Sequence, residues 1–163
     1  MQIHPPRNKN TNSFSRGLIS GSVAAIVSSI ALIVRSKRDA KTPLSAQNAV
    51  SHWVWGEEAK HRHGLSASHT LLGYGIHHAA SVFWGVIYER YAYSRPLPPF
   101  EEVLRATAFA ALANFVDYRL TPHRFKPGFE HHLTKKSLTL VYGAFALGLA
   151  AGHLLQESRR DVE

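Results

Sequence analysis

Two adjacent histidines, His77 and His78, lie in the middle of TLLGYGIHHAASVFWGVIY, a run from residue 70 to residue 88 without Asp, Glu, Lys or Arg. An imidazole can form hydrogen bonds, carry a proton near neutral pH or bind a metal ion. In a run long enough to cross a bilayer, such a ring needs protein partners rather than hydrocarbon. Three interpretations are therefore open: structural hydrogen bonds within a helix bundle, a relay for protons or solutes, and ligation of a metal or haem.

Helical spacing places polar residues of two segments on faces that can meet. In the first segment His69, His77 and Ser81 share a stripe with Gly73 and Gly85, and Glu89 lies at its far end. In the second, Asn114 and Asp117 share a face. We expect a polar cluster within the membrane that consists of His69, His77, His78, Asn114, Asp117 and Glu89.

A metal site is the alternative use of the histidines that lie in the loops. The stretches HRHG and FEHH, together with His69, supply imidazoles on one side of the predicted bundle, and zinc accepts such ligands. The candidate ligands are His61, His63, His69, His131 and His132. A bis-histidine haem is not expected, because His153 lies near the far end of its span and not at the depth of His77. We expect no bound cofactor.

No catalytic signature is present in the sequence. It contains no GxSxG, HExxH, Walker or GxGxxG motif, and zero cysteines exclude disulfides, thiolate metal sites and cysteine nucleophiles. The sequence gives no reason to expect an enzyme.

Four apolar segments predict an all-α membrane protein with a single domain, residues 1–163. Three charge-free windows (17–34, 64–88 and 137–156) each have 18 residues or more, and about 20 residues of helix cross a hydrocarbon core of about 30 Å. A shorter window, 106–116, is extended by arginine stems that reach the headgroups. We expect spans at about 17–35, 68–90, 102–118 and 137–156, with mobile tails at 1–15 and 157–163.

The segment between the first two spans is expected to lie on the membrane surface. It starts near Pro43 and carries Trp53 and Trp55, which favour the headgroup level, so a short interfacial helix is predicted. A plain solvated loop is the alternative.

The charges predict an orientation and a lipid partner. A net charge of +8 would indicate nucleic acid or an anionic surface in a water-soluble chain, but here the charges lie outside the apolar runs, so we expect anionic lipid and no nucleic acid. Loops 36–67 and 119–136 carry more Lys and Arg than the tails and the loop after the second span, which favours a cytoplasmic location for them. The inverted orientation stays open because the N-terminal tail is also basic.

The loop before the last span has a distinctive sequence. In PHRFKPGFE, two prolines and Gly128 predict a tight turn, and Glu130 can pair with an arginine at the headgroup level. The turn and headgroup residues are Pro122, Arg124, Lys126, Pro127, Gly128 and Glu130.

This P-x-R-x-x-P-G-F-E stretch, and the H-x-x-x-G-Y-G segment that begins at His69, resemble small uncharacterised bacterial inner-membrane proteins of the YagU kind. The resemblance covers about 70 residues. It implies a multi-spanning protein of the bacterial cytoplasmic membrane and carries no known chemistry.

The predicted function is that of a structural or accessory membrane subunit. Small residues recur at every fourth position in the first and last spans, for example Gly17 and Gly21, or Gly148 and Gly152, and such stripes allow helices to approach closely. They would serve packing within the chain, or association into a homo-oligomer or a larger membrane complex. Two alternatives stay open: a small transporter or proton-conducting element that uses the intramembrane His and Asp, and a metal-binding membrane protein.

Overall fold

The computed structural model describes residues 9–93, 95 and 97–160, and this part of the chain is helical, without a strand. The α-helices are α1 (Lys9–Asp39), α2 (Ser45–Ala49), α3 (His52–Trp55), α4 (Leu72–Ala92), α5 (Pro99–Phe115) and α6 (Lys135–Arg160). Single turns of other helix types join them: η1 (Glu57–His61), η4 (His123–Phe125) and η5 (Phe129–His131) are 3₁₀, and η2 (Ala67–Leu71) and η3 (Val116–Leu120) are π. The prediction of an all-α fold is confirmed.

Each long helix covers one of the predicted apolar segments. The span expected at 68–90 consists of two elements, η2 and α4. The one expected at 102–118 consists of α5 and η3. α1 starts at Lys9 and α6 continues to Arg160, so parts of the expected mobile tails are helical. The remainder of those tails, 1–8 and 161–163, lies outside the described residues.

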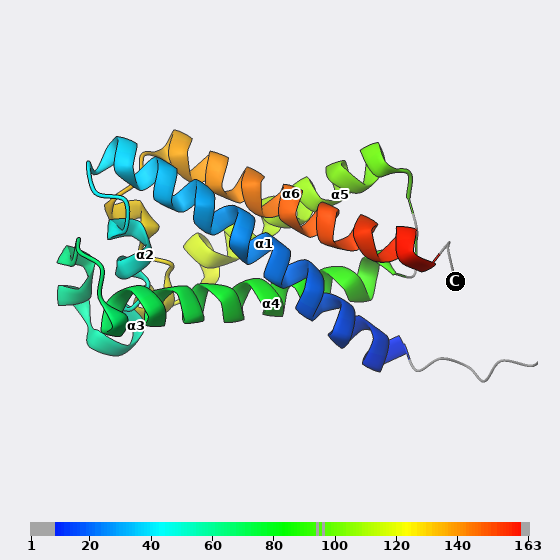
Figure 1. Ribbon diagram of the computed structural model, residues 1–163, viewed down its shortest axis with the longest axis horizontal. Coiled ribbons are helices and arrows are strands. Elements are labelled where there is room, and N and C mark those ends of the chain that lie inside the picture. The colour runs from blue at the N-terminus through cyan, green and yellow to red at the C-terminus, as the bar shows by residue number, and fades with distance from the viewer. Residues whose placement is uncertain (1–8, 94, 96, 161–163) are drawn as a thin grey trace, which may run out of the picture.

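The first helix occupies the middle of the arrangement. α1 packs along α4 on one side and along α6 on the other (Figure 1). Glycines bring the backbones into contact: a Cβ atom added to Gly21 would lie 2.5 Å from the Cα of Val82, and one added to Gly148 would lie 2.5 Å from the Cα of Ala24. The small-residue stripes of α1 and α6 therefore serve packing within this chain.

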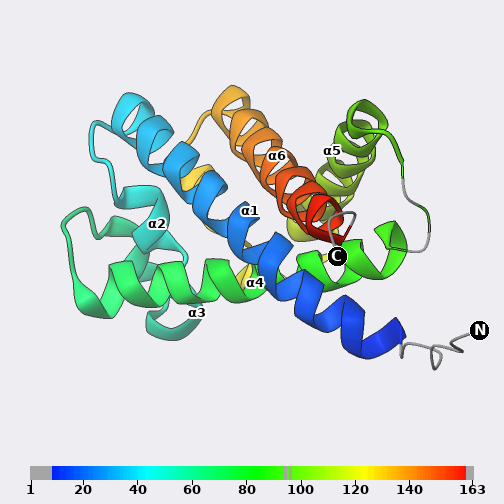
Figure 2. The same ribbon diagram turned by 45° about the vertical axis from the view of Figure 1, so that its right-hand side comes forward.

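The fifth helix is the outer member of the bundle. α5 packs mainly on α6 and has little contact with α4, to which it lies at a steep angle (Figure 2). The contact between α4 and α5 is aromatic: Phe109 packs edge-on against Trp84 and Tyr88, with ring centroids 6.0 and 5.5 Å apart. Away from that contact the two helices leave a space between them.

Both connections at the other end of the bundle pack against each other. Instead of one interfacial helix, the structure has α2 and α3, because Ser51 donates both its N–H and its hydroxyl to the Asn48 carbonyl and so interrupts the helix. The Trp53 indole donates to the Lys126 carbonyl at 2.9 Å, and Arg124 donates back to the Trp53 carbonyl at 3.0 Å. The two loops thus lie on one side of the bundle, as expected from antiparallel spans.

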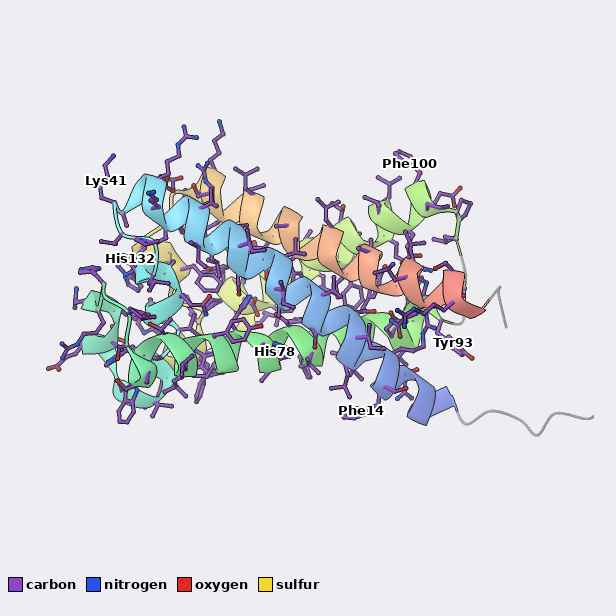
Figure 3. The ribbon with its side chains drawn as sticks, viewed as in Figure 1. Phe14, Lys41, His78, Tyr93, Phe100 and His132 are labelled. Atoms are coloured by element: carbon purple, nitrogen blue, oxygen red, sulfur yellow. The ribbon has the colours of Figure 1, made fainter. Side chains whose placement is uncertain are left out.

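The bundle exposes large apolar side chains and also buries several polar ones. Large apolar side chains point outward from all four long helices, and Phe14 and Phe100 are 58% and 74% exposed (Figure 3). Ser20, Ser28 and Glu89, by contrast, are fully buried. Among the described residues, two helical segments, Ser13–Asp39 and Lys135–Arg159, are long and apolar enough to cross a membrane.

The glycine contacts generate a test of the packing. We expect Gly21→Ala to destabilise the fold by about 1–3 kcal/mol, because its methyl group would collide with the backbone of α4 rather than with a flexible side chain. Titration with dodecyl sulfate in mixed micelles, followed by circular dichroism, measures the effect.

Gly75→Ala is the matched control, because a Cβ atom at Gly75 would meet no atom within 4 Å. It should be neutral or stabilising by up to about 1 kcal/mol, since alanine has the higher helix propensity. Equal stabilities of the two variants would show that the close approach of α1 and α4 does not contribute.

Candidate functional site

A cavity of about 490 Å³ lies between α4 and α5 and is partly open to the outside. α4 and the α5–η3 segment form its walls, α6 and Ser28 of α1 form its base, and residues 125–129 with Trp53 close the end at the loops. The lining is mostly apolar and aromatic, as in small-molecule sites. Few polar groups face it, so the position of each one matters.

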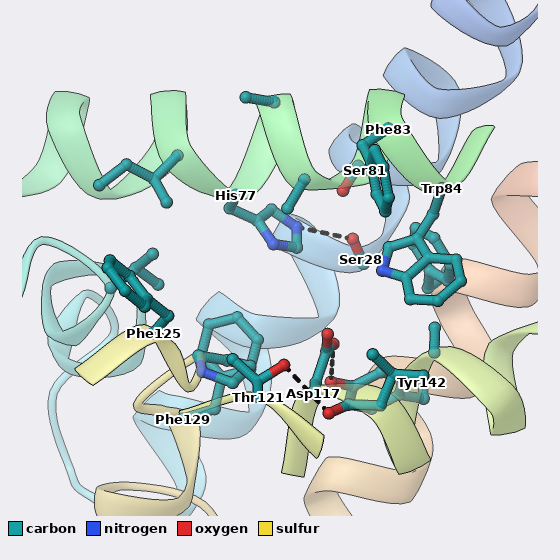
Figure 4. Close-up of a pocket in the computed structure, with 18 of the residues that line it drawn as sticks. Ser28, His77, Ser81, Phe83, Trp84, Asp117, Thr121, Phe125, Phe129 and Tyr142 are labelled. Carbon is teal, nitrogen blue, oxygen red and sulfur yellow. Dashed lines mark hydrogen bonds between the residues drawn. The ribbon is translucent and has the colours of Figure 1, made fainter. Parts of the chain in front are cut away.

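On the α4 side the polar group is His77, which points toward α1 (Figure 4). Its Nε2 lies 2.9 Å from the hydroxyl of Ser28, and that hydroxyl donates its own proton to the Ala24 carbonyl at 2.7 Å. While the Ser28 hydroxyl donates to Ala24, its oxygen can accept the Nε2–H of His77. In that tautomer Nδ1 is the hydrogen-bond acceptor of the ring.

Across the cavity from His77 lies a carboxylate, Asp117 of η3 (Figure 4). The hydroxyl of Tyr142 on α6 donates to its Oδ2 at 2.7 Å, which holds the carboxylate at the cavity wall. In the described part of the chain no Lys, Arg or His nitrogen lies within 4.0 Å of its oxygens. Asp117 is thus a partly buried acid without a partner cation.

The expected intramembrane cluster is divided by the structure. His77 and Asp117 line the cavity together, whereas His78 bonds to Ser22 of α1 at 3.1 Å and to Tyr74 at 3.2 Å, away from it. His69 lies in the π turn η2, with Nδ1 3.0 Å from the Ser68 hydroxyl. Asn114, half-buried near the end of α5, is not among the residues that line the cavity.

Glu89 belongs to a different site, a buried network where α1, α4 and α6 meet. Its side chain is fully buried and accepts from Arg16 Nε at 2.9 Å, from His153 Nδ1 at 3.0 Å and from the hydroxyl of Ser20. Gln156 adds a donor to Ser20 at 2.9 Å. Every lone pair that a buried carboxylate presents needs such a partner.

A second buried carboxylate, Glu102 of α5, continues this network. Its exposed fraction is 0%, and it accepts from the hydroxyl of Tyr88 and from the guanidinium of Arg105. His153 joins the two acids, since its Nε2 lies 3.9 Å from Glu102. Arg16 also donates to Glu157 at 2.6 Å. Two arginines and one histidine therefore face three carboxylates.

Sequence reasoning missed Arg16, Glu102 and His153 as members of one network. The sequence could have indicated this network. In a bundle of antiparallel helices, the start of the first helix, the end of the second and the end of the last lie at the same level. Of these residues the sequence analysis considered only His153, and only as a possible haem ligand. The buried network links all four long helices.

The histidines proposed as metal ligands lie in the two packed loops. The rings of His63 and His132 are in edge contact at 5.8 Å, and Nε2 of His131 lies 3.9 Å from Glu130. Within residues 9–93, 95 and 97–160, no group of three or more His, Asp or Glu side chains is arranged to hold a metal ion. His132 instead donates from Nε2 to the Lys60 carbonyl at 2.7 Å.

The turn residues of the second loop lie where the prolines and glycine predicted a turn. Gly128 adopts a left-handed conformation with φ 83°, and its backbone passes close to the Ala49 carbonyl and the ring of His52. A side chain at this position would be strained. Pro127 lines the cavity, and Lys126 provides the carbonyl bound by Trp53. Pro122 precedes η4, and no described arginine pairs with Glu130.

Comparisons with protein-family models, with curated proteins and with solved structures find no match to this chain. The site is therefore interpreted from its own geometry.

The buried network should be a major source of stability. We expect Glu89→Ala to destabilise the fold by about 3–5 kcal/mol, because buried Arg16 and His153 would lose the carboxylate that lies between them. Glu101→Ala, which removes an exposed carboxylate from the first turn of α5, should cost less than about 1 kcal/mol. Unfolding by dodecyl sulfate compares the two, and a similar loss in both would contradict the assigned role.

The loop contact of His132 should make the stability depend on pH. Burial lowers the pKa of His132, so the folded state holds the ring neutral while the unfolded state protonates it near its usual pKa of about 6.5. The contribution is complete above that pH and declines as the pH falls below it.

His132→Gln keeps a donor for the Lys60 carbonyl and cannot titrate, so its stability should fall less between pH 7 and pH 5 than that of the wild type. The same substitution at exposed His123 should leave the slope unchanged. Thermal unfolding measured at several pH values gives the slopes, and identical slopes for wild type and His132→Gln would refute the assignment.

Proposed function

We propose that this chain is an integral membrane protein whose four long helices cross the bilayer. The observation that carries the proposal is the exposure of large apolar side chains on all four long helices. Ile30 of α1, Phe83 of α4, Phe115 of α5 and Leu147 of α6 are between 53% and 60% exposed, on helices whose inner faces hold charged and hydroxyl groups. Water would penalise this arrangement, whereas hydrocarbon favours it.

The lengths and flanks of the helices support the same proposal. α1 and α6 meet the requirements of a span by themselves. α4 has 21 residues, and α5 with its 17 residues continues directly into η3, so each is close to the length that crosses a hydrocarbon core of about 30 Å. Arg35, Lys37 and Arg38 at the end of α1, and Lys135 and Lys136 at the start of α6, fit the headgroup level.

Within the membrane, the cavity between α4 and α5 favours a transporter-like role in which the protein binds a small solute. Structural subunits need complementary surfaces, but they do not need an apolar cavity with an unpaired carboxylate. The glycine stripes that suggested an accessory subunit are occupied by contacts among α1, α4 and α6. An accessory role would therefore use another surface, such as the outer face of α5.

The membrane proposal predicts that alkaline carbonate leaves the protein in the membrane fraction and that detergent releases it. Because the chain has no cysteine, single cysteines also test the number of spans. Arg62→Cys and His123→Cys should react with an impermeant maleimide from one side of the membrane, and Glu101→Cys from the other.

Two outcomes count against the proposal in different ways. If only α1 and α6 cross the membrane, all three cysteines lie on the same side, which excludes four spans but keeps a membrane protein. If carbonate extracts the chain and it stays dispersed without detergent, the membrane proposal itself fails.

A further inference from the structure

We infer that the cavity between α4 and α5 binds a lipophilic organic cation and that Asp117 is its counter-ion. The inference rests on the proposed function, because it treats the cavity as a solute site reached from the membrane. It is carried by the charge and the chemistry of the lining residues.

The charge of the lining residues favours a cationic ligand over an anionic one. Asp117 is the one carboxylate at the cavity, and neither Lys nor Arg is among the described residues that line it. Tyr142 and Trp84 donate hydrogen bonds to this acid, but both donors are neutral, so no described cation neutralises it. An anionic ligand would meet an uncompensated carboxylate, whereas a cation would form an ion pair in a site of low dielectric constant.

The aromatic groups favour a bulky organic cation over a metal ion. A cation is attracted to the faces of aromatic rings, most strongly to that of tryptophan. The rings available at the cavity are Trp53, Trp84, Phe125, Phe129, Tyr142 and Phe145. A small hydrated ion would need a cluster of several ligands, and among the described residues no group of three or more His, Asp or Glu side chains is arranged to hold a metal ion.

The second polar group refines the ligand class. When the Nε2–H of His77 is directed to Ser28, the ring offers its Nδ1 lone pair as an acceptor for an N–H group. A lipophilic amine in its protonated form can satisfy both Asp117 and this acceptor. The volume of about 490 Å³ lies in the range of small-molecule sites.

Ethidium, an aromatic cation with amino groups and a convenient fluorescence, is a suitable probe. We expect the purified full-length protein in detergent to bind it with a measurable change in fluorescence polarisation. Asp117→Asn should weaken binding by about tenfold or more, because it removes the buried counter-ion but preserves size. Glu101→Gln removes an exposed carboxylate elsewhere on α5 and should bind as the wild type does.

A second measurement uses the wild-type protein alone and so does not depend on the folding of a variant. Tetraphenylphosphonium and tetraphenylborate have the same shape and opposite charges. The phosphonium should displace ethidium, and the borate should not.

Equal displacement by both ions, or undiminished binding by Asp117→Asn, would overturn the inference, and so would failure of the folded protein to bind ethidium. Each of these results leaves the membrane proposal intact, because carbonate extraction and cysteine labelling test that proposal without a ligand.

Discussion

The close approach of α1 to α4 is the constraint on which the rest of the structure depends. A Cβ atom added to Gly85 would lie 2.7 Å from the Gly17 carbonyl oxygen and from the Cα of Gly21. Only at this separation do Arg16 and Ser20 reach Glu89 on the next turn of α4. Because α1 also packs along α6, one helix organises two of its neighbours, and α5 is left to pack on the outer side of α6.

The buried and partly buried carboxylates in this arrangement are of two kinds: those with cationic partners and one without. Glu89 and Glu102 lie where four helices converge, and arginine, histidine and hydroxyl groups satisfy them. Asp117 lies at the cavity between α4 and α5, with the neutral side chains of Tyr142 and Trp84 as its donors. Burying a charge is costly unless it is paired, so the first two acids are explained by the fold. No described cation pairs with Asp117, and this difference from the other two acids is what motivates the proposed ligand.

The sequence predicted the helices well, because charge-free runs of about 20 residues leave few other structures open to the chain. It could not predict which helices pair, because small residues recur along several of them. A Cβ atom added to Gly75 or Gly143 would meet no atom within 4 Å, whereas one added to Gly21 would meet the backbone of α4. The sequence could not predict the cavity either, because the volume of the cavity depends on the distance between α4 and α5. The network was missed for a physical reason: Arg16 and Glu102 lie at helix ends, where a charge is usually explained by the headgroups or water around it.

The two central histidines are adjacent in the sequence but have different surroundings in the structure. Successive residues of a helix point about 100° apart, so His77 and His78 cannot share one environment. Both bond to serines of α1, His77 to Ser28 and His78 to Ser22, and each therefore helps to hold α4 against α1. Only His77 also borders the cavity. The hydrogen bond to Ser28 engages Nε2 of His77, so Nδ1 is the nitrogen that the proposed ligand would use.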